Sequence, residues 1–241
     1  VETVVPPTPS GEVYTLHEGE RCGDSYTDNN VPALGYVSGF AYTVNADGKT
    51  CTITGIGEIT ETAIGIPTEI DGYTVTEIGK RAFGTDDKKQ FKTISLPATI
   101  NYISGNGPFA VCVVLTEIKV DSANEHYTAV DGVLYSKDMT ELICYPAKKT
   151  DATYKIPEGV KKIGRSAFYF SEIQEVIFPS SLEEIGIFSL ASCRKLGKID
   201  ISNTKVKTLN DYAFAYNNSL HEVKLPETLL EIKGAVFAEC T

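Results

Sequence analysis

Residues 155–168, KIPEGVKKIGRSAF, carry the pattern that decides the fold. The same order of residues recurs along the chain and gives one template of about 23 residues. The template reads L-x2-I-x-I-P-x2-V-x2-I-G-x3-A-F-x2-C, and the next Leu follows after two more residues. The V-x2-I-x4-F frame inside it recurs six times, which excludes coincidence. We therefore predict that most of the chain consists of seven copies of one unit.

The periods inside the unit predict its local structure. The I-x-I step alternates buried and exposed positions as a strand does, and the following Pro ends the strand because it has no N–H to donate. The V-x2-I-G segment fits a tight turn and a second short extended or 3₁₀ segment, after which the Ala-Phe pair plugs the core from the opposite wall. A unit this short cannot bury both walls. Neighbouring units must therefore stack, with their strands in a parallel sheet and one unbroken apolar interior between the walls.

Two segments depart from the template. Residues 131–145 predict a β-hairpin, with a turn over 137–140, that replaces the second half of its unit. Residues 42–53 predict a second hairpin with an Asp47-Gly48 turn, which is expected to cap the N-terminal end of the stack. Because protruding loops often carry function, the hairpin at 131–145, which we expect to project from the scaffold, is a further candidate for ligand contact.

Three stretches resemble the BspA-like, or Treponema-type, leucine-rich repeats of bacterial surface proteins: IPTEIDGYTVTEIGKRAF (66–83), VDGVLYSKDMTELICYP (130–146) and KIPEGVKKIGRSAF (155–168). The resemblance covers about residues 40–241 and includes the hairpin as well as the repeat. It implies a leucine-rich-repeat solenoid, a right-handed superhelix with a parallel β-sheet on one wall and short strands or 3₁₀ turns on the other. It also implies a secreted or cell-surface bacterial protein, of a class associated with adhesion. Separately, the Pro/Thr-rich residues 1–11 are expected to be a tether left after removal of a signal peptide.

The chain departs from the family pattern at a few template positions. Ser202 stands where Pro is expected, Ser171 and Asn217 stand at the Cys position, and Ser189-Leu190 replaces Ala-Phe. The family has no defined catalytic residues, so these departures remove no implied function.

The repeat region is assigned to residues 66–241, with the hairpin insertion at about 131–145. A capping region over 12–65 and a flexible Pro/Thr-rich tether over 1–11 precede it. The net charge of −10 argues against nucleic acid and anionic membranes as partners, because both repel an acidic surface. No apolar run reaches the ~18–20 residues that membrane insertion needs.

No motif of catalysis, cofactor binding or metal binding is complete. None of the three histidines has a nucleophile or a second zinc ligand at the required spacing. Gly55-Ile56-Gly57 lacks the third glycine of a dinucleotide-binding loop, and residues 45–49 lack the remaining ligands of a calcium loop. We therefore expect no enzyme activity, no cofactor and no metal.

The cysteines are interpreted through the repeat. Cys112, Cys193 and Cys240 share one template position, where other units have Ser or Asn. A small residue is expected there, and the thiols are expected to form a ladder of buried free side chains instead of disulfides. Cys22 and Cys51 both fall in the capping region, and the sequence leaves open whether they pair.

The outward residues of the strands form the predicted binding surface, because parallel stacking aligns them in columns. One column contains Thr93, Glu117, Thr153, Glu175, Lys198 and Glu222, and its neighbour contains Ser95, Lys119, Lys155, Ile177, Asp200 and Lys224. Two interpretations stay open, namely charge pairs that keep the sheet soluble and a surface for a polar protein ligand. The candidate ligand-facing residues are Glu117, Lys119, Lys155, Glu175, Ile177, Lys198, Asp200, Glu222 and Lys224.

The leading functional hypothesis is a non-enzymatic binding scaffold for adhesion or protein–protein interaction, with a host matrix protein or another cell-surface protein as its ligand. One alternative is a carbohydrate-recognition accessory module, which predicts an aromatic platform that the two columns lack. Another alternative is a structural spacer in a larger surface protein. An alternative binding surface is the opposite side, where Tyr169, Phe170, Tyr212 and Tyr216 follow the Ala-Phe plugs, although we expect most of them to be half-buried wall residues. We expect a mostly monomeric chain, with weak self-association through the strand edge of its last unit.

Overall fold

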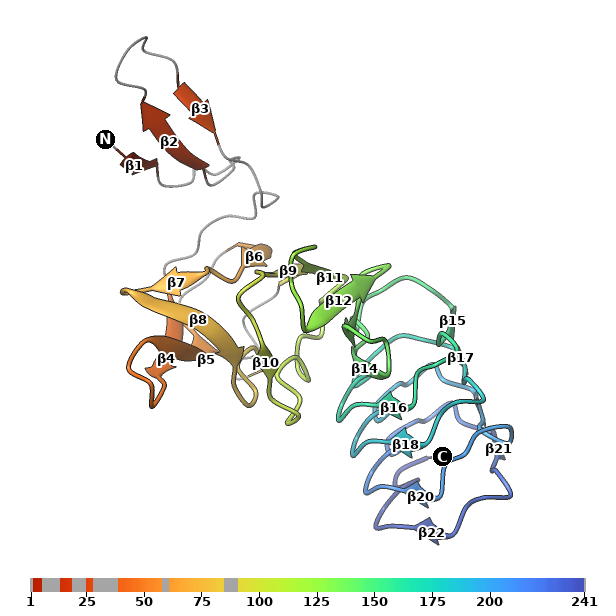
Figure 1. Cartoon of the computed structure of the whole chain (residues 1–241). Helices are drawn as coiled ribbons and strands as arrows, with labels where there is room; N and C mark the ends of the chain where they lie inside the picture. The colour runs from red at the N-terminus through yellow and green to blue at the C-terminus, as the bar shows by residue number, and fades with distance from the viewer. Residues whose placement is uncertain are drawn as a thin grey trace.

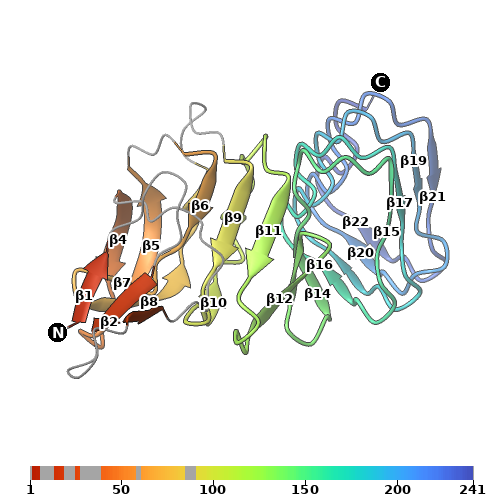
Figure 2. The same ribbon diagram turned by 90° about the horizontal axis from the view of Figure 1, so that it is seen from above.

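The computed structural model describes residues 2–5, 14–18, 25–27, 39–57, 61–84 and 91–240 (Figure 1). Within these residues the chain forms short strands joined by turns and contains no helix. From β4 onward the strands belong to stacked coils, shown from the side in Figure 1 and from above in Figure 2. The predicted solenoid is confirmed.

The first wall of the solenoid is built from the I-x-I segments. Its strands are β6 (Ala63–Gly65), β9 (Thr93–Leu96), β11 (Glu117–Val120), β15 (Thr153–Lys155), β17 (Glu175–Ile177), β19 (Lys198–Asp200) and β21 (Glu222–Lys224). Every pairing in this wall is parallel. In β9, Ile94 and Leu96 are buried and Pro97 follows the last strand residue, as the template predicts.

The second wall is built from the V-x2-I segments and lies across the core from the first. Its N-terminal sheet contains β4 (Phe40–Val44), β5 (Thr50–Ile56), β7 (Glu69–Ile70), β8 (Tyr73–Ile78) and β10 (Tyr102–Ile103). Its C-terminal sheet contains β12 (Tyr127–Val130), β13 (Val133–Ser136), β14 (Glu141–Cys144), β16 (Lys162–Ile163), β18 (Glu184–Ile185), β20 (Thr208–Leu209) and β22 (Glu231–Ile232). From β14 to β22 the strands pair in parallel, and Ile163, Ile185 and Leu209 are fully buried.

The Ala-Phe segments form a third row of hydrogen bonds between units. We call these segments the plug turns; in the C-terminal half they span residues 165–170, 187–192, 211–216 and 234–239. The first of them donates from the N–H groups of Ser166, Phe168 and Phe170 to the C=O groups of Ile187, Ser189 and Ala191, and the next two repeat this pattern. A left-handed backbone recurs in each turn, as at Ser166 (φ 56°) and Phe170 (φ 61°). Each coil of the C-terminal half is therefore bonded to the next on three sides.

Strands β12, β13 and β14 form an antiparallel meander in the third unit. β14 takes the second-wall position, with Leu142 in register with Ile163 of β16, so the predicted replacement of that half-unit is confirmed. The hairpin between β12 and β13 was not predicted from the sequence; it turns at Asp131 (φ 49°) and Gly132 (φ 76°).

The meander divides the apolar interior into two clusters. Val133 and Tyr135 pack into the C-terminal cluster, whereas Leu134 between them packs into the N-terminal cluster, and all three are 0% exposed. β13 is thus a partition that is buried on both faces. The expectation of one unbroken interior is therefore wrong. The expectation of a projecting hairpin at 131–145 is also wrong, because the uninterrupted apolar run of β13 needs cover on both faces. The units beyond the meander stack along a different direction from those before it (Figure 1).

The N-terminal region holds two small antiparallel arrangements. β1 (Glu2–Val5), β2 (Tyr14–Glu18) and β3 (Ser25–Thr27) form one sheet, so part of the expected tether over 1–11 is a strand, in keeping with its Thr-Val-Val composition. The hairpin of β4 and β5 is confirmed, with Gly48 (φ 64°) in its turn. β5 pairs with β8, which places this hairpin at the N-terminal end of the second wall. β6, just before residue 66, already pairs with β9 of the first wall.

Candidate functional site

The backbone register aligns the predicted columns on the four C-terminal strands of the first wall. The first column runs through Thr153, Glu175, Lys198 and Glu222, each in register with the next. In the second column Lys155 is in register with Ile177, and Asp200 with Lys224. We call the outward surface of β15, β17, β19 and β21 the charged face.

Glu117 and Lys119 lie outside the charged face. They are in register with Thr93 and Ser95 of β9, and β11 belongs to a separate three-stranded sheet. The columns are broken here because the chain from 121 to 152 builds the meander between β11 and β15. The prediction of columns that continue from Glu117 to Thr153 is therefore wrong.

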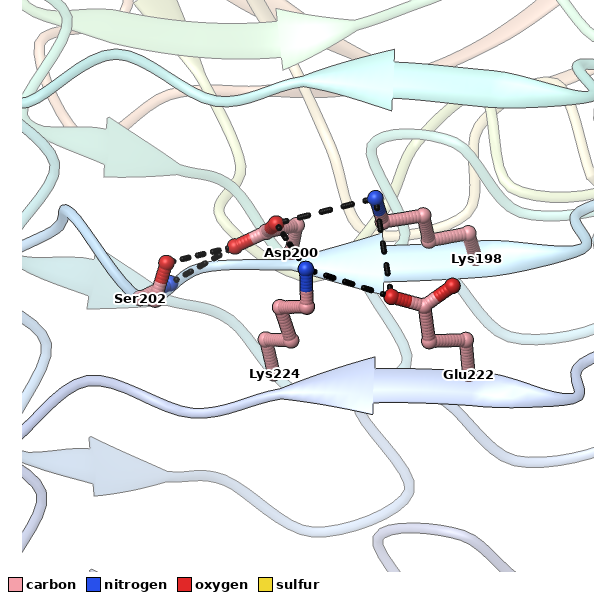
Figure 3. Close-up of polar contacts among 5 residues, drawn as sticks. All are labelled: Lys198, Asp200, Ser202, Glu222 and Lys224. Atoms are coloured by element: carbon pink, nitrogen blue, oxygen red, sulfur yellow. Dashed lines mark hydrogen bonds and ion pairs between the residues drawn. The ribbon is translucent and has the colours of Figure 1, made fainter.

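Four charges on β19 and β21 form a closed ring of ion pairs (Figure 3). Lys198 Nζ lies 3.7 Å from Asp200 Oδ2 and 3.6 Å from Glu222 Oε1. Lys224 Nζ lies 3.6 Å from Asp200 Oδ2 and 3.3 Å from Glu222 Oε1. Each cation thus contacts both anions, and the ring is neutral. Since its side chains are 34–53% exposed, water screens these pairs and they contribute little to stability.

Hydrogen bonds favour the charged forms of Asp200 and Lys224 in this ring. The Ser202 hydroxyl donates to Asp200 Oδ1 at 2.6 Å, which lowers the pKa of Asp200, and the two lysines lower it further. Glu222 accepts a hydrogen bond from Lys224 and raises the pKa of that lysine. Ser202 stands where the template has Pro, so this departure supplies a donor to the ring.

A shallow hollow of about 240 Å³ lies on the charged face. It brings together four of the predicted residues: Glu175, Ile177, Lys198 and Asp200. Ile177 is 44% exposed, a large apolar side chain surrounded by charged neighbours. Lys155, Glu222 and Lys224 do not line the hollow. Lys155 is in register with Ile177, and Glu222 and Lys224 belong to the ion-pair ring.

Phe178, Asn203 and Thr204 also line this hollow, and none of them was predicted as a site residue from the sequence. Phe178 occupies a core position of the template and packs partly against the C-terminal cluster. Asn203 and Thr204 follow the strand in the unit that lacks Pro, where one extra residue separates Ile201 from Val206. This extra residue was the feature of the sequence from which a change in the surface after β19 could have been predicted.

The cysteine ladder is confirmed, and its hydrogen bonds explain the residue choice. Cys112, Cys144 and Cys193 are buried free thiols, and Cys240 is a half-buried one. Four of the ladder positions donate to a plug-residue C=O of an earlier unit: Cys112 to Phe83 at 3.5 Å, Cys193 to Phe168 at 3.1 Å, Cys240 to Phe214 at 3.2 Å and Asn217 to Leu190 at 3.0 Å. The position therefore selects a hydrogen-bond donor and not only a small side chain.

Burial controls the chemistry of these thiols. It raises the pKa of Cys112 and of Cys193 to about 12, so both are neutral at physiological pH and poor nucleophiles. Cys51 is a buried free thiol in β5. Its suggested partner Cys22 lies outside the described residues.

The other sequence candidates do not assemble into a reactive site. The Asp47 carboxylate accepts N–H groups from Lys49 and Thr50 at 2.8 and 2.9 Å, which is ordinary turn chemistry. Among the described residues, no three His, Cys, Asp or Glu side chains are grouped so that they could hold a metal ion. In the same part of the chain, no helix could serve as a membrane span.

The repeat is similar to known bacterial proteins in sequence and in fold. A family model described as BspA type leucine rich repeat region matches residues 66–148 and 148–241, in six copies. A leucine rich cell surface protein from Faecalibacterium prausnitzii A2-165 has 20% identity and a TM-score of 0.52, over 87% of this chain and 87% of its own. A leucine-rich repeat protein from Bacteroides ovatus ATCC 8483 has 22% identity and a TM-score of 0.54, over 84% of this chain and 50% of its own. A comparison with curated protein sequences finds no match.

Proposed function

Because the chain belongs to the family of BspA-type leucine-rich-repeat proteins, we propose that it is a protein-binding module of a bacterial surface protein. The ligand is a protein of the host matrix or another cell-surface protein. It docks on the charged face, around the hollow that holds Ile177. The module acts by adhesion and performs no reaction of its own.

The single observation that carries this proposal is the exposed Ile177 inside a charged border. Protein interfaces combine a small apolar centre, which loses its water on binding, with a polar rim. Ile177 supplies the centre at 44% exposure, and Glu175, Lys198 and Asp200 supply the rim. A column that only kept the sheet soluble would carry a charged or hydroxyl residue at this position, as the neighbouring Lys155 does.

The ion-pair ring suits a recognition surface. Its four charges are already paired with one another, so a ligand that covers them does not leave a single charge buried alone. Their alternation along β19 and β21 sets the charge pattern that a partner must match. Such complementarity governs specificity and association rate more than affinity.

Surface plasmon resonance against immobilised fibronectin, laminin, fibrinogen and collagen tests the proposal. We expect at least one of these proteins to bind, and we expect Ile177→Asp to raise its Kd at least ~10-fold, because a charge then occupies the apolar centre. Leu230→Asp is the matched control, since Leu230 is 81% exposed and precedes β22 of the second wall. If none of the four proteins binds, a ligand from the host matrix is ruled out. If both variants bind like the unaltered chain, the proposed docking on the charged face is wrong.

Charge reversal at the ring gives a second readout. Lys224→Glu places a third carboxylate beside Asp200 and Glu222. We expect a changed association rate and a changed salt dependence, with a smaller effect on dissociation. An association rate that is unchanged at low salt places the ligand elsewhere on the solenoid.

A further inference from the structure

The third unit has no plug turn, and this leaves a break in the third row of hydrogen bonds. Tyr145, Pro146 and Ala147 occupy the place of Ala-Phe, with the Tyr145 N–H donating to the Ala167 C=O at 2.7 Å. On the surface, the second unit, which contains β9 and β10, directly meets the fourth unit, which contains the plug turn 165–170. The contact is at Gly107 (φ 63°) of the second unit, where a Cβ atom would lie 3.3 Å from the Ser166 side chain. Two hollows, of about 280 and 380 Å³, lie at this break and share Arg165.

The charge of the two hollows is opposite to that of the whole chain. The smaller hollow contains Lys80, Arg81 and Arg165, and its described lining includes no carboxylate. The larger hollow contains Lys162 and Arg165, with Glu141 as its acidic residue, and Glu141 lies 3.2 Å from Lys162. In a chain of net charge −10, this is a local concentration of cations.

Arg165 is positioned for an anion at the centre of the break. It is half-buried, and its Cζ atom lies 5.8 Å from the centroid of the Phe188 ring. Phe188 is itself stacked on Tyr212 at 4.7 Å, so the support under the guanidinium is fixed. Within the described part of the chain, Arg165 forms no ion pair. An arginine held on an aromatic ring keeps its edge N–H groups free to donate in pairs to a carboxylate or sulfate.

The remaining lining selects the kind of molecule that carries the anion. The linings of the two hollows also include hydroxyl and amide side chains: Asn101, Ser104, Asn106, Ser136 and Ser166. These groups exchange hydrogen bonds with the hydroxyl groups of a sugar. The two volumes are near the lower end of the ~300–1,000 Å³ typical of small-ligand sites, which suits one or two sugar rings.

We propose that the break between the second and fourth plug turns binds an anionic oligosaccharide, with a carboxylate or sulfate group on Arg165. This site is separate from the charged face, which lies on the first wall. The chain then holds two independent recognition surfaces, one for a protein and one for an acidic sugar.

Isothermal titration of the full chain tests this site. The probes are a heparin-derived tetrasaccharide, a tetragalacturonate, the neutral maltotetraose, hexaglutamate and inorganic sulfate. We expect at least one of the two acidic tetrasaccharides to bind, more weakly as salt increases, and maltotetraose not to bind. Arg165→Gln is expected to raise the Kd at least ~10-fold, because a charge-assisted pair of hydrogen bonds is lost.

Matched variants separate this site from general electrostatics and from the charged face. Arg194→Gln removes an equal charge from an exposed arginine outside both hollows and is expected to change the Kd less than ~2-fold. Ile177→Asp is expected to leave sugar binding unchanged. Lys80→Gln, at an exposed position, reports on the same hollow if Arg165→Gln unfolds the chain.

Several outcomes overturn the proposal. It fails if neither acidic tetrasaccharide binds at millimolar concentration, or if maltotetraose binds equally well. Hexaglutamate binding with equal affinity would make this a site for acidic peptides, and inorganic sulfate binding with equal affinity would make it a site for simple anions. Equal effects of Arg165→Gln and Arg194→Gln would show that only the overall charge matters.

Discussion

Leu134→Ala tests whether β13 is a structural partition. Leu134 is 0% exposed and packs into the N-terminal cluster, while Val133 and Tyr135 on the other face pack into the C-terminal cluster. The substitution truncates the β13 side chain that packs into the N-terminal cluster. It leaves the hydrogen bonds of β13 to β12 and β14 in place.

The expected loss is about 3–4 kcal/mol of unfolding free energy. Three buried carbons contribute about 2.4 kcal/mol, at about 0.8 kcal/mol for each methylene group. The cavity adds to this when its walls cannot close, and Leu→Ala changes in cores cost about 2.7–5 kcal/mol. Because β13 is bonded on both sides and packed on its opposite face, its backbone cannot move far into the gap.

Urea unfolding followed by far-UV circular dichroism measures this loss. With an m-value of about 3 kcal/mol/M, the midpoint should fall by about 1 M. Val130→Ala, on the neighbouring strand at 40% exposure, is the control and should cost no more than about 0.5 kcal/mol. If Leu134→Ala costs less than about 1 kcal/mol, the meander is a surface hairpin and the reasoning is refuted.

Three further predictions concern buried polar groups and the ion-pair ring. Asn124→Leu should lower the free energy of unfolding, measured in urea, by about 3 kcal/mol or more, because Asn124 is 0% exposed and its side chain makes four hydrogen bonds. A loss below about 1 kcal/mol would contradict this prediction. The free energy of unfolding should fall as the pH rises from about 9 to about 12, because the thiols of Cys112 and Cys193 lose their protons at a lower pH in the unfolded chain than in the folded one. Each thiol should contribute about 1.4 kcal/mol per pH unit to this fall. A free energy of unfolding that stays constant up to pH 11 would argue against buried thiols. Asp200→Asn should cost less than about 1 kcal/mol, and less still in 1 M NaCl, so a large loss that salt does not reduce would show that the ring is structural.

The regular part of the fold could be predicted because each unit repeats the same local rules. Ile94 and Leu96 before Pro97 specify a strand that is buried on one face, and Phe168 after Ala167 specifies the plug. The thiol ladder could also be predicted from one shared position. The hydrogen bond from Cys193 to the Phe168 carbonyl could not, because it depends on the distance between units.

The interruptions could not be predicted from the template. The run Val133-Leu134-Tyr135 did signal burial on both faces, but periodicity alone does not say which two surfaces it separates. The positions of the charged face and of the hollows around Arg165 also depend on the meander. The columns broke at Glu117 because the meander separates β11 from β15, and Arg165 faces a hollow because the third unit lacks a plug turn.

Oxidative cross-linking between neighbouring first-wall strands tests the central claim most directly, namely that the outward residues stand in columns on stacked parallel strands. In the double variant Glu175→Cys/Lys198→Cys the two Cα atoms are register partners, at the ~4.8 Å spacing of adjacent strands, within reach of a disulfide. In Thr153→Cys/Lys198→Cys the positions are two strands apart, at about 9.6 Å, beyond that reach. Peptide mapping after mild oxidation should find the cross-link in the first variant and not in the second. A cross-link in the second variant, or none in the first, would contradict the stacking on which both proposed surfaces depend.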